Sequence, residues 1–321
     1  MADLGSTCVL VYDVGGSHIS AAICSGPDYR LGPVAQAHHP QEQSSNAFLD
    51  VLTQQAAQVG ASRSCVAGAS LAMPGPFDYE TGVSWMRHKM PYLYGTNLGH
   101  ALAKRLGWKD GQVQFLNDAA AFLWGELGAG AARGVTRAVG ITLGTGVGSA
   151  FAANGCVQTS GPGIPPGGEI WNLPFEGGIV EDMISTRALK KNYRQATGRD
   201  REVADIAAGA SGDPVAEEVF AHFGADLGRV LRTLFAEFAP EIVVLGGGIA
   251  RSAQLFLPAA ENALQGFPVQ LRVSSLGDRA PLIGACVDWF VRSAQKTSGG
   301  HEVSGHDLSR AEESASKLQG A

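Results

Sequence analysis

Paired cysteines, clustered basic residues and long apolar runs are all missing from this sequence of 321 residues. Its five cysteines are scattered without a CxxC or CxC pair, so neither a disulfide framework nor a cysteine-based zinc site is indicated. Lys and Arg number 24 against 30 Asp and Glu, and the formal net charge of −6 argues against a nucleic-acid surface. No apolar stretch approaches the length of a membrane span, and no export signal is visible. We therefore expect a cytoplasmic protein with no nucleic-acid and no membrane partner.

The composition is that of a globular protein, with 45% hydrophobic and 17% charged residues, and the length allows two domains. The sequence predicts an α/β fold in which apolar strand runs alternate with helices. Three of the cysteines lie in apolar strand-like runs and are expected to be buried. The predicted strands cover 7–13, 18–24, 65–72, 113–116, 137–143, 149–151 and 241–245, and the predicted helices cover 46–59, 97–106, 119–128, 184–193, 214–238 and 281–295.

The stretch from Val113 to Phe151 organises the chain. It predicts a strand, a helix and a glycine-rich hairpin, with Asn117 and Asp118 at the junction of the strand and the helix. Substrates of open α/β sheets gather at the carboxyl ends of strands, and a helix start adds unpaired N–H groups. The alternative for this pair is a plain helix cap.

Three glycine turns follow predicted strands. Asp13-Val-Gly-Gly-Ser17 and Gly144-Thr-Gly-Val-Gly148 each close a hairpin, whereas Gly246-Gly-Gly248 leads into a helix. Glycine turns let a phosphate approach bare backbone N–H groups, although a purely structural hairpin turn is the alternative for Gly144–Gly148. A Rossmann interpretation of Gly246–Gly248 is disfavoured, because the pattern breaks at Arg251. The chain has no GxxxxGK[ST] loop and is therefore not a P-loop enzyme.

Acidic residues stand in a second glycine-rich segment, from Ser160 to Asp182. Glu169 and Glu181 are the candidates for function there, with solubility as the alternative reading. The basic residues at positions 87–89 are interpreted as part of a solvated loop. Phosphoryl transfer from ATP to an alcohol needs phosphate-binding turns, Mg²⁺ and a carboxylate that takes the hydroxyl proton. This set of residues is therefore typical of such a reaction.

These motifs, in this order, resemble the ROK family (repressors, open reading frames and sugar kinases) from about Val9 to about Val287. Met73-Pro-Gly-Pro76 is similar to the family's sugar-side turn, and Asn117-Asp118 to its Asn-Asp pair. The resemblance implies a two-domain, actin-like and ribonuclease-H-like α/β fold with a cleft between the domains. It also implies a hexose kinase, most closely a glucokinase, that uses ATP and Mg²⁺ and forms a homodimer.

The resemblance also assigns roles to individual residues. Asp118 is the expected general base. The expected sugar-binding residues are Gly75, Pro76, Asn117, Glu169, Asn172 and Glu181. The expected residues for ATP and its magnesium are Asp13, Gly15, Gly16, Ser17, Gly144, Thr145, Gly146, Gly247 and Gly248.

One signature departs from the family. Glu-x-Gly-His and a zinc-binding cysteine knot are usual there, whereas this chain has Glu169-Ile-Trp171-Asn172 and lacks those cysteines. We therefore expect no structural zinc, and the departure leaves the identity of the sugar open. Fructose, mannose or an N-acetylhexosamine is an alternative substrate.

The expected domains are residues 1–116 with 281–296, and residues 117–280, followed by a polar tail over 297–321. A non-catalytic sugar-binding protein is a further alternative. A sugar-sensing repressor is disfavoured, because Asp13 comes too early for a preceding winged helix.

Overall fold

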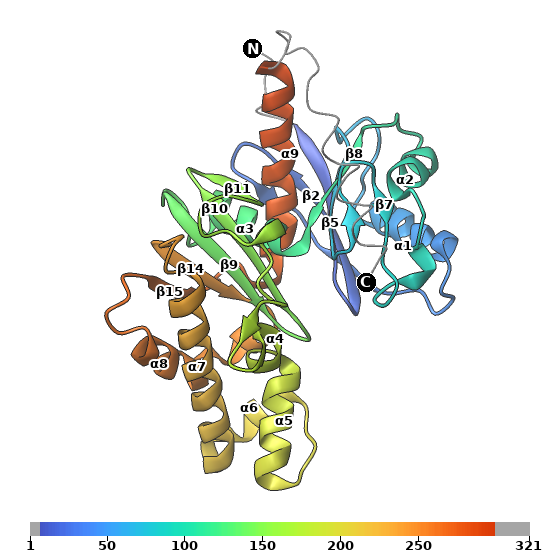
Figure 1. The fold of residues 1–321 in the computed structure, drawn as a ribbon. Helices are drawn as coiled ribbons and strands as arrows, with labels where there is room; N and C mark the ends of the chain where they lie inside the picture. Colours follow the sequence, from blue (N-terminus) through green and yellow to red (C-terminus); the bar gives the residue numbers. More distant parts are fainter. Residues whose placement is uncertain (1–6, 299–321) are drawn as a thin grey trace, which may run out of the picture. The chain divides into compact units, whose positions relative to one another are not determined.

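The computed structural model describes residues 7–298, and its two larger β-sheets have helices packed on them (Figure 1). The first sheet has the order β3-β2-β1-β5-β8, with β4 paired to β2, and the second has the order β11-β10-β9-β14-β15. The first consists of β1 (Cys8–Val14), β2 (His18–Ser25), β3 (Arg30–Leu31), β4 (Ala35–His38), β5 (Ala69–Met73) and β8 (Val113–Asn117). The second consists of β9 (Arg137–Leu143), β10 (Val147–Ala153), β11 (Cys156–Gln158), β14 (Ile242–Gly246) and β15 (Gln270–Val273).

Two short hairpins and the helices complete the described chain. The hairpins are β6 (Phe77–Asp78) with β7 (Val83–Ser84), and β12 (Pro174–Phe175) with β13 (Gly178–Ile179). The helices are α1 (Ser45–Gln58), α2 (Leu98–Leu106), α3 (Asp118–Ala129), α4 (Val180–Met183), α5 (Thr186–Thr197), α6 (Val203–Gly209), α7 (Pro214–Leu234), α8 (Ala253–Ala263) and α9 (Ala280–Ser298). None of the helices in residues 7–298 combines the length and the apolarity that crossing a membrane requires.

The register of the first sheet places the predicted site residues at one edge. Strands β1, β5 and β8 are parallel, with Asp13 opposite Ala72 and Met73 opposite Asn117. The carboxyl ends of the three strands therefore meet, which is where open α/β sheets bind ligands. The apolar residues that precede these ends are buried, and the polar residues Asp13 and Asn117 lie at the less buried ends of their strands.

The second sheet repeats this arrangement. Strands β9 and β10 form an antiparallel hairpin, as β1 and β2 do, and β14 lies parallel to β9 with Gly246 opposite Thr142. The turns that follow β9 and β14 therefore meet at one sheet edge. A Cβ at Gly247, whose φ is +84°, would lie 2.4 Å from the Leu143 carbonyl oxygen, so the close approach of these turns requires glycine.

Buried residues form separate clusters. One contains side chains from Leu10 to Phe115 and a larger one contains side chains from Val139 to Leu271. In the larger cluster α7 packs closely on α8, since a Cβ at Gly224 would lie 2.1 Å from the Phe256 carbonyl oxygen. The predicted domain boundaries stay a prediction. Phe290 begins a second unit, of which the helical stretch to Ser298 is described.

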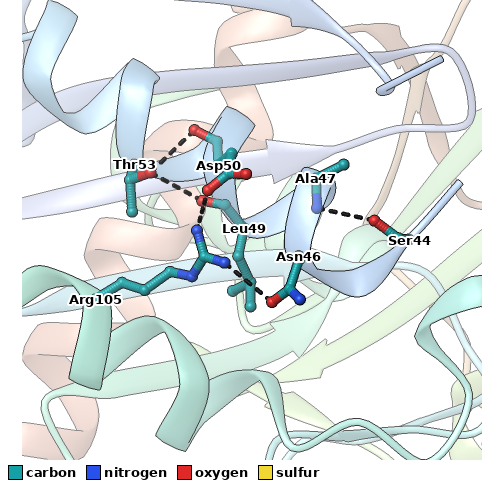
Figure 2. A network of polar contacts seen from close by, with 7 residues as sticks. All are labelled: Ser44, Asn46, Ala47, Leu49, Asp50, Thr53 and Arg105. Atoms are coloured by element: carbon teal, nitrogen blue, oxygen red, sulfur yellow. Dashed lines mark hydrogen bonds and ion pairs between the residues drawn. The ribbon is translucent and has the colours of Figure 1, made fainter. Parts of the chain in front are cut away.

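Figure 2 shows how α1 and α2 are tied together. The Arg105 guanidinium on α2 bonds to the Asp50 carboxylate and to the Asn46 side chain on α1. Ser44 caps α1 by accepting a hydrogen bond from the Ala47 N–H at 3.1 Å. The Arg105 bonds therefore join α2 to α1, whereas the Ser44 cap stabilises the start of α1 alone.

Several predicted elements differ from the structure. Cys65 is exposed and precedes β5 rather than lying in it. Helix α7 ends at Leu234, not at residue 238 as predicted. Phe235 and Phe238 continue the apolar spacing of the helix, but they lie in the turn that follows it and are buried from there. The chain after Gly248 forms a 3₁₀ turn over Ile249–Ser252 before α8 begins. Helix α9 extends to Ser298, into the predicted polar tail, and the rest of that tail lies outside the described residues.

An ion-pair network joins the β12–β13 hairpin to α7. Arg229 bonds to both carboxylate oxygens of Glu176 at 3.0 and 3.2 Å and to Asp226 at 2.5 Å. The Asp226 side chain is 3% exposed. Its burial raises the pKa of this carboxyl, while His222 and Arg229 act in the opposite direction. Arg229 therefore neutralises a carboxylate that the fold has removed from water.

Arg229→Gln is expected to lower the free energy of unfolding by about 2 kcal/mol at neutral pH, because Asp226 keeps a buried charge without its main partner. The loss should shrink at acidic pH, where Asp226 is protonated. Urea unfolding at several pH values measures both effects. Asp226→Asn in the Arg229→Gln background should recover most of the loss, and no recovery would contradict this role for Asp226.

Candidate active site

Asn117 and Asp118 join β8 to α3. Asn117 ends the strand and caps the helix, because its Oδ1 accepts from the N–H groups of Ala119 and Ala120 at 2.9 and 3.1 Å. Asp118 is the first helical residue, and its Oδ1 accepts from the Ala119 N–H at 2.9 Å. The helix cap is supplied by Asn117, and the half-buried Asp118 carboxylate stands beside it at the end of β8, so the structural and the functional interpretations of this pair are compatible.

Tyr79, which sequence reasoning missed, supports this junction. Its hydroxyl donates to the Met73 carbonyl oxygen at 3.1 Å and accepts from Asn117 Nδ2 at 3.2 Å. Burial raises the pKa of Tyr79, and the nearby carboxylates of Asp118 and Glu169 raise it further. Gly75 and Pro76 turn the chain between Met73 and Tyr79, and a Cβ at Gly75 would lie 3.5 Å from the tyrosine hydroxyl. The predicted sugar-side turn is thus in contact with the predicted base region.

Acidic side chains lie close enough here to change one another's ionisation. Burial raises the pKa of Asp118, and Glu169 raises it further, whereas Lys89 and the Ala119 N–H lower it. Burial, Asp118 and Asp278 together raise the pKa of Asp13 to about 7. The structure therefore brings Asp13, Asp118 and Glu169 together from three separate parts of the chain. Lys89, interpreted as part of a solvated loop, is exposed but also acts on Asp118.

The segment around Glu169 is anchored to β10. The buried Ser149 hydroxyl donates to the Gly168 carbonyl oxygen at 2.6 Å and accepts from the Ile170 N–H at 3.0 Å. The Trp171 indole N–H donates to the Glu169 carboxylate at 3.0 Å. Trp171 thus orients Glu169 through a bond that the sequence did not predict. Asn172 follows Trp171 and is exposed.

Glu181 lies against the Gly144–Gly148 turn. Its Oε2 accepts from the Val147 N–H at 3.2 Å, and a Cβ at Gly146 would lie 2.7 Å from this oxygen. Its backbone N–H donates to the Trp171 carbonyl oxygen at 3.0 Å. Glu181 therefore connects the Glu169 segment to the second glycine turn. Its predicted contact with a sugar stays a prediction.

The glycine turns differ in how tightly they are held. Gly15 closes the first turn by donating from its N–H to the His18 carbonyl oxygen at 3.0 Å, and His39 Nε2 donates to the Gly15 carbonyl oxygen at 2.8 Å. Ser17 is exposed and bonds to His18. A Cβ added at Gly16 or at Gly248 would have no described atom within 4 Å, other than atoms of the adjoining backbone. These two positions leave open space beside bare backbone.

The second turn is tied to α5. The Gly144 N–H donates to the Gly146 carbonyl oxygen at 3.0 Å, and the Gly144 carbonyl oxygen accepts from the Thr186 N–H at 2.8 Å. Thr145 is left between these bonds at the tip of the turn. Gly144, Thr145 and Gly146 thus present a shaped loop at the sheet edge, beside Gly247 of the third turn.

A family model for the ROK family matches residues 9–291. The chain belongs to the ROK family. The glucokinase of Thermotoga maritima is 31% identical over 219 residues, which are 60% of this chain and 68% of that protein. The N-acetylgalactosamine kinase of Shewanella sp. is 24% identical over 304 residues, covering 86% of this chain and 94% of that one.

The solved structures agree on the fold. The ROK hexokinase from Thermus thermophilus superposes with a TM-score of 0.73 at 26% identity, covering 90% of this chain and all of that one. A ROK family glucokinase from Streptomyces griseus gives a TM-score of 0.72 at 23% identity, covering 88% of this chain and 99% of that one. The predicted actin-like α/β fold is confirmed.

Within residues 7–298 no three His, Cys, Asp or Glu side chains are grouped so that they could hold a metal ion. None of the cysteines within residues 7–298 forms a disulfide.

Proposed function

We propose that this chain is an ATP-dependent hexose kinase, most closely a glucokinase, that phosphorylates the primary hydroxyl of its sugar. The observation that carries the proposal is the Asp118 carboxylate, which is half-buried, raised in pKa and placed at the sheet edge beside Asp13 and Glu169. A base with a raised pKa takes a hydroxyl proton better near neutral pH. The kinases among the relatives support the same reaction class.

In the proposed reaction, the sugar lies between the Gly75-Pro76 turn and the Glu169 segment. Asn117 and Glu169 orient its hydroxyls, and Asn172 and Glu181 complete the set. Asp118 accepts the proton of the attacking hydroxyl as the hydroxyl oxygen bonds to the γ-phosphorus, while the bond from that phosphorus to the β–γ bridging oxygen breaks and ADP leaves. Buried hydroxyls left without partners cost free energy, which explains why several amide and carboxylate side chains surround the sugar.

The donor phosphates would contact the turns at Gly15-Gly16-Ser17 and Gly144-Thr145-Gly146, and the adenosine would lie over Gly247-Gly248. The open backbone at Gly16 and Gly248 fits this arrangement. Asp13 fits an ordering role for Mg²⁺, because Mg²⁺ keeps several waters and binds one or two carboxylates plus phosphate oxygens. When bound, Mg²⁺ offsets the charge of the phosphates. A nearby cation would also favour the ionised form of Asp13.

The experiment is a coupled ADP-release assay with Mg-ATP and a panel of glucose, fructose, mannose and N-acetylhexosamines. We expect the highest kcat/KM with glucose. Turnover with another sugar alone would replace glucose in the proposal and assign specificity to the Glu169–Glu181 segment. Silence across the panel in a protein that binds ATP would overturn the kinase assignment in favour of a non-catalytic sugar-binding protein.

Trp171→Phe is expected to raise the KM for the hexose about fivefold, because the Glu169 carboxylate loses the donor that orients it. The KM for ATP should stay within about twofold, since the hydrogen bond that the indole donates goes to Glu169 and not to a glycine turn. Steady-state kinetics in both substrates separates the two effects. Trp85→Phe is the control, because it makes the same change in an exposed indole that packs edge-on to Tyr94. Equal effects of the two substitutions would contradict the role of Trp171.

A further inference from the structure

His39 lies between the first glycine turn and a distant 3₁₀ turn over Pro91–Leu93. Its Nε2 is 2.8 Å from the Gly15 carbonyl oxygen, and its Nδ1 is 3.2 Å from the Tyr92 hydroxyl. The residue follows β4 directly and is half-buried, whereas Tyr92 belongs to the 3₁₀ turn. One imidazole therefore joins two segments that are far apart in the sequence.

The two partners of the imidazole decide which of its nitrogens carries the proton. A carbonyl oxygen can only accept, so Nε2 of His39 donates to Gly15. In the neutral ring Nδ1 is then the acceptor, and the Tyr92 hydroxyl donates to it. Burial raises the pKa of Tyr92, so this hydroxyl keeps its proton at neutral pH. Tyr92 therefore favours the tautomer that can hold Gly15.

Aromatic packing holds the imidazole in this orientation. The His39 ring stacks on the Phe48 ring, with centroids 6.2 Å apart and planes inclined by 15°. Phe48 is fully buried on α1, and its ring also lies 6.4 Å from that of Tyr92. Packing as well as hydrogen bonding thus fixes the ring, as is needed for a side chain that orients another group.

The bond from His39 sets the direction of a peptide group in the first glycine turn. The peptide between Gly15 and Gly16 is planar and trans, so its C=O and its N–H point in opposite directions. Because the Gly15 carbonyl is turned toward His39, the Gly16 N–H is directed away from it. No backbone oxygen of residues 7–298 accepts from this N–H, and the space beside Gly16 is open.

The rest of the turn leaves Gly15 little freedom. Its N–H donates to the His18 carbonyl oxygen at 3.0 Å, so both polar groups of its backbone are occupied. The turn is therefore held at Gly15 and keeps the N–H of Gly16 for an acceptor from outside the chain.

We propose that His39 is a positioning residue for the donor, and that by holding the Gly15 carbonyl oxygen it aims the Gly16 N–H at a phosphate oxygen. The inference rests on the proposed function for the identity of the donor, which is Mg-ATP. His39 acts through the peptide and does not itself touch the phosphate. An N–H that is already aimed costs no reorganisation when the phosphate binds or when charge moves during transfer.

Two amide substitutions separate the bonds of His39. Counted from Cβ, the Nε2 of glutamine is as many bonds away as the Nε2 of histidine, and the Nδ2 of asparagine matches the histidine Nδ1. His39→Gln therefore keeps a donor for Gly15, whereas His39→Asn keeps a polar group near Tyr92 and does not reach Gly15. Both variants lose the ring that stacks on Phe48, so each is the control for the packing change in the other.

We expect His39→Asn to lower kcat/KM for Mg-ATP about tenfold, with the KM for hexose within about twofold of the parent. His39→Gln should stay within about threefold of the parent in both. Steady-state kinetics in each substrate and titration calorimetry with Mg-ATP and with hexose are the measurements. Equal losses with ATP in the two variants overturn the inference. A loss with hexose in His39→Asn that is as large as the loss with ATP also overturns it, because the effect is then a general disturbance.

Tyr92→Phe tests the same inference with a smaller change, and it decides the matter if His39→Asn does not fold. It removes one hydroxyl and keeps the ring beside Phe48, but Nδ1 of His39 loses the donor that favours the required tautomer. We expect kcat/KM for Mg-ATP to fall about threefold. Tyr94→Phe is the control, since it removes an exposed hydroxyl that bonds to Arg87. Equal kinetics of the two variants with ATP overturn the inference.

The inference and the proposed function fail in different ways. Binding of Mg-ATP that depends on His39, in a protein that phosphorylates no hexose, removes the kinase function and leaves the positioning role. Hexose phosphorylation with the same kcat/KM for Mg-ATP in His39→Asn, His39→Gln and the parent removes the positioning role and leaves the kinase.

Discussion

Asp118→Asn is expected to lower kcat for hexose phosphorylation about a thousandfold, the size of effect that general base catalysis supplies. An amide of the same shape cannot take the hydroxyl proton, but its oxygen still accepts from the Ala119 N–H that Asp118 now holds. Helix α3 keeps its cap, because Asn117 supplies that function. The variant should therefore fold and bind hexose while the chemical step is lost.

The measurements are steady-state kinetics with Mg-ATP and hexose, together with thermal unfolding. Asp110→Asn makes the same chemical change at an exposed carboxylate that pairs with His100, and it should leave kcat unchanged. The melting temperature of Asp118→Asn should equal or exceed that of the parent, because its charge raises the pKa of Asp13 by repulsion. A kcat within about tenfold of the parent would remove Asp118 from the role of base.

The edge where the site lies could be predicted because apolar strands end there in polar residues. Asp13 follows a buried run in β1, and Asn117 ends a similar run in β8. The parallel register of β1, β5 and β8 then brings the two ends together, which is a general property of such sheets. Caps such as Asn97 and Asp213 were predictable for a related reason, since one local side chain satisfies the first helix N–H groups.

Contacts between distant segments could not be predicted in this way. Tyr79 reaches Asn117 because the chain folds back after the Gly75-Pro76 turn, and no local pattern marks that path. Glu176 and Arg229 are 53 positions apart and pair because the β12–β13 hairpin packs on α7. The absence of the family's cysteine knot was visible in the sequence, whereas the pairing of Arg229 with Glu176, which anchors the β12–β13 hairpin, was not.

Strand β15 and the place of α5 beside the second glycine turn were missed for different reasons. Gln270–Val273 is a short strand without strong alternation, and its conformation depends on pairing with β14. The basic residues of α5 are readable as an ordinary solvated helix face. The sequence did not show that the Thr186 N–H donates to the Gly144 carbonyl oxygen, which places the start of α5 beside the glycine turn.

Asp13→Asn is expected to stabilise the protein while impairing its use of ATP. Burial and the charges of Asp118 and Asp278 raise the pKa of Asp13 from its ordinary value of 3.8 to about 7. Between these two values the folded protein holds a proton that the unfolded chain releases. The free energy of unfolding contributed by this group therefore falls as pH rises from about 4 to about 7 and stays low above that.

Asparagine carries no charge, so the free energy of unfolding of the variant does not fall with the ionisation of this group. At pH 8 it should unfold with a free energy about 2 kcal/mol higher than the parent, with about 4 kcal/mol as the upper bound from the pKa shift. Asp13 is half-buried, and solvent access places the expected gain below that bound. At pH 4 the difference should nearly vanish, because Asp13 is then largely protonated in the folded parent. Urea unfolding at the two pH values tests the sign as well as the size.

The same substitution should lower kcat/KM for Mg-ATP by about 10- to 100-fold, because an amide orders the waters of Mg²⁺ less well than a carboxylate. In the parent, kcat/KM for ATP should fall as pH drops below about 7, where Asp13 takes up a proton. The variant should keep only the acid limb of the base Asp118, and that limb should lie at lower pH because the repulsion by Asp13 is gone. Asp28→Asn is the matched control, since Asp28 is an exposed carboxylate that pairs with Arg30. A variant that is stabilised but keeps full ATP kinetics would show that the Asp13 charge destabilises the fold and has no role at the donor site. A variant that loses activity without gaining stability would show that the charge of Asp13 is already neutralised in the folded parent.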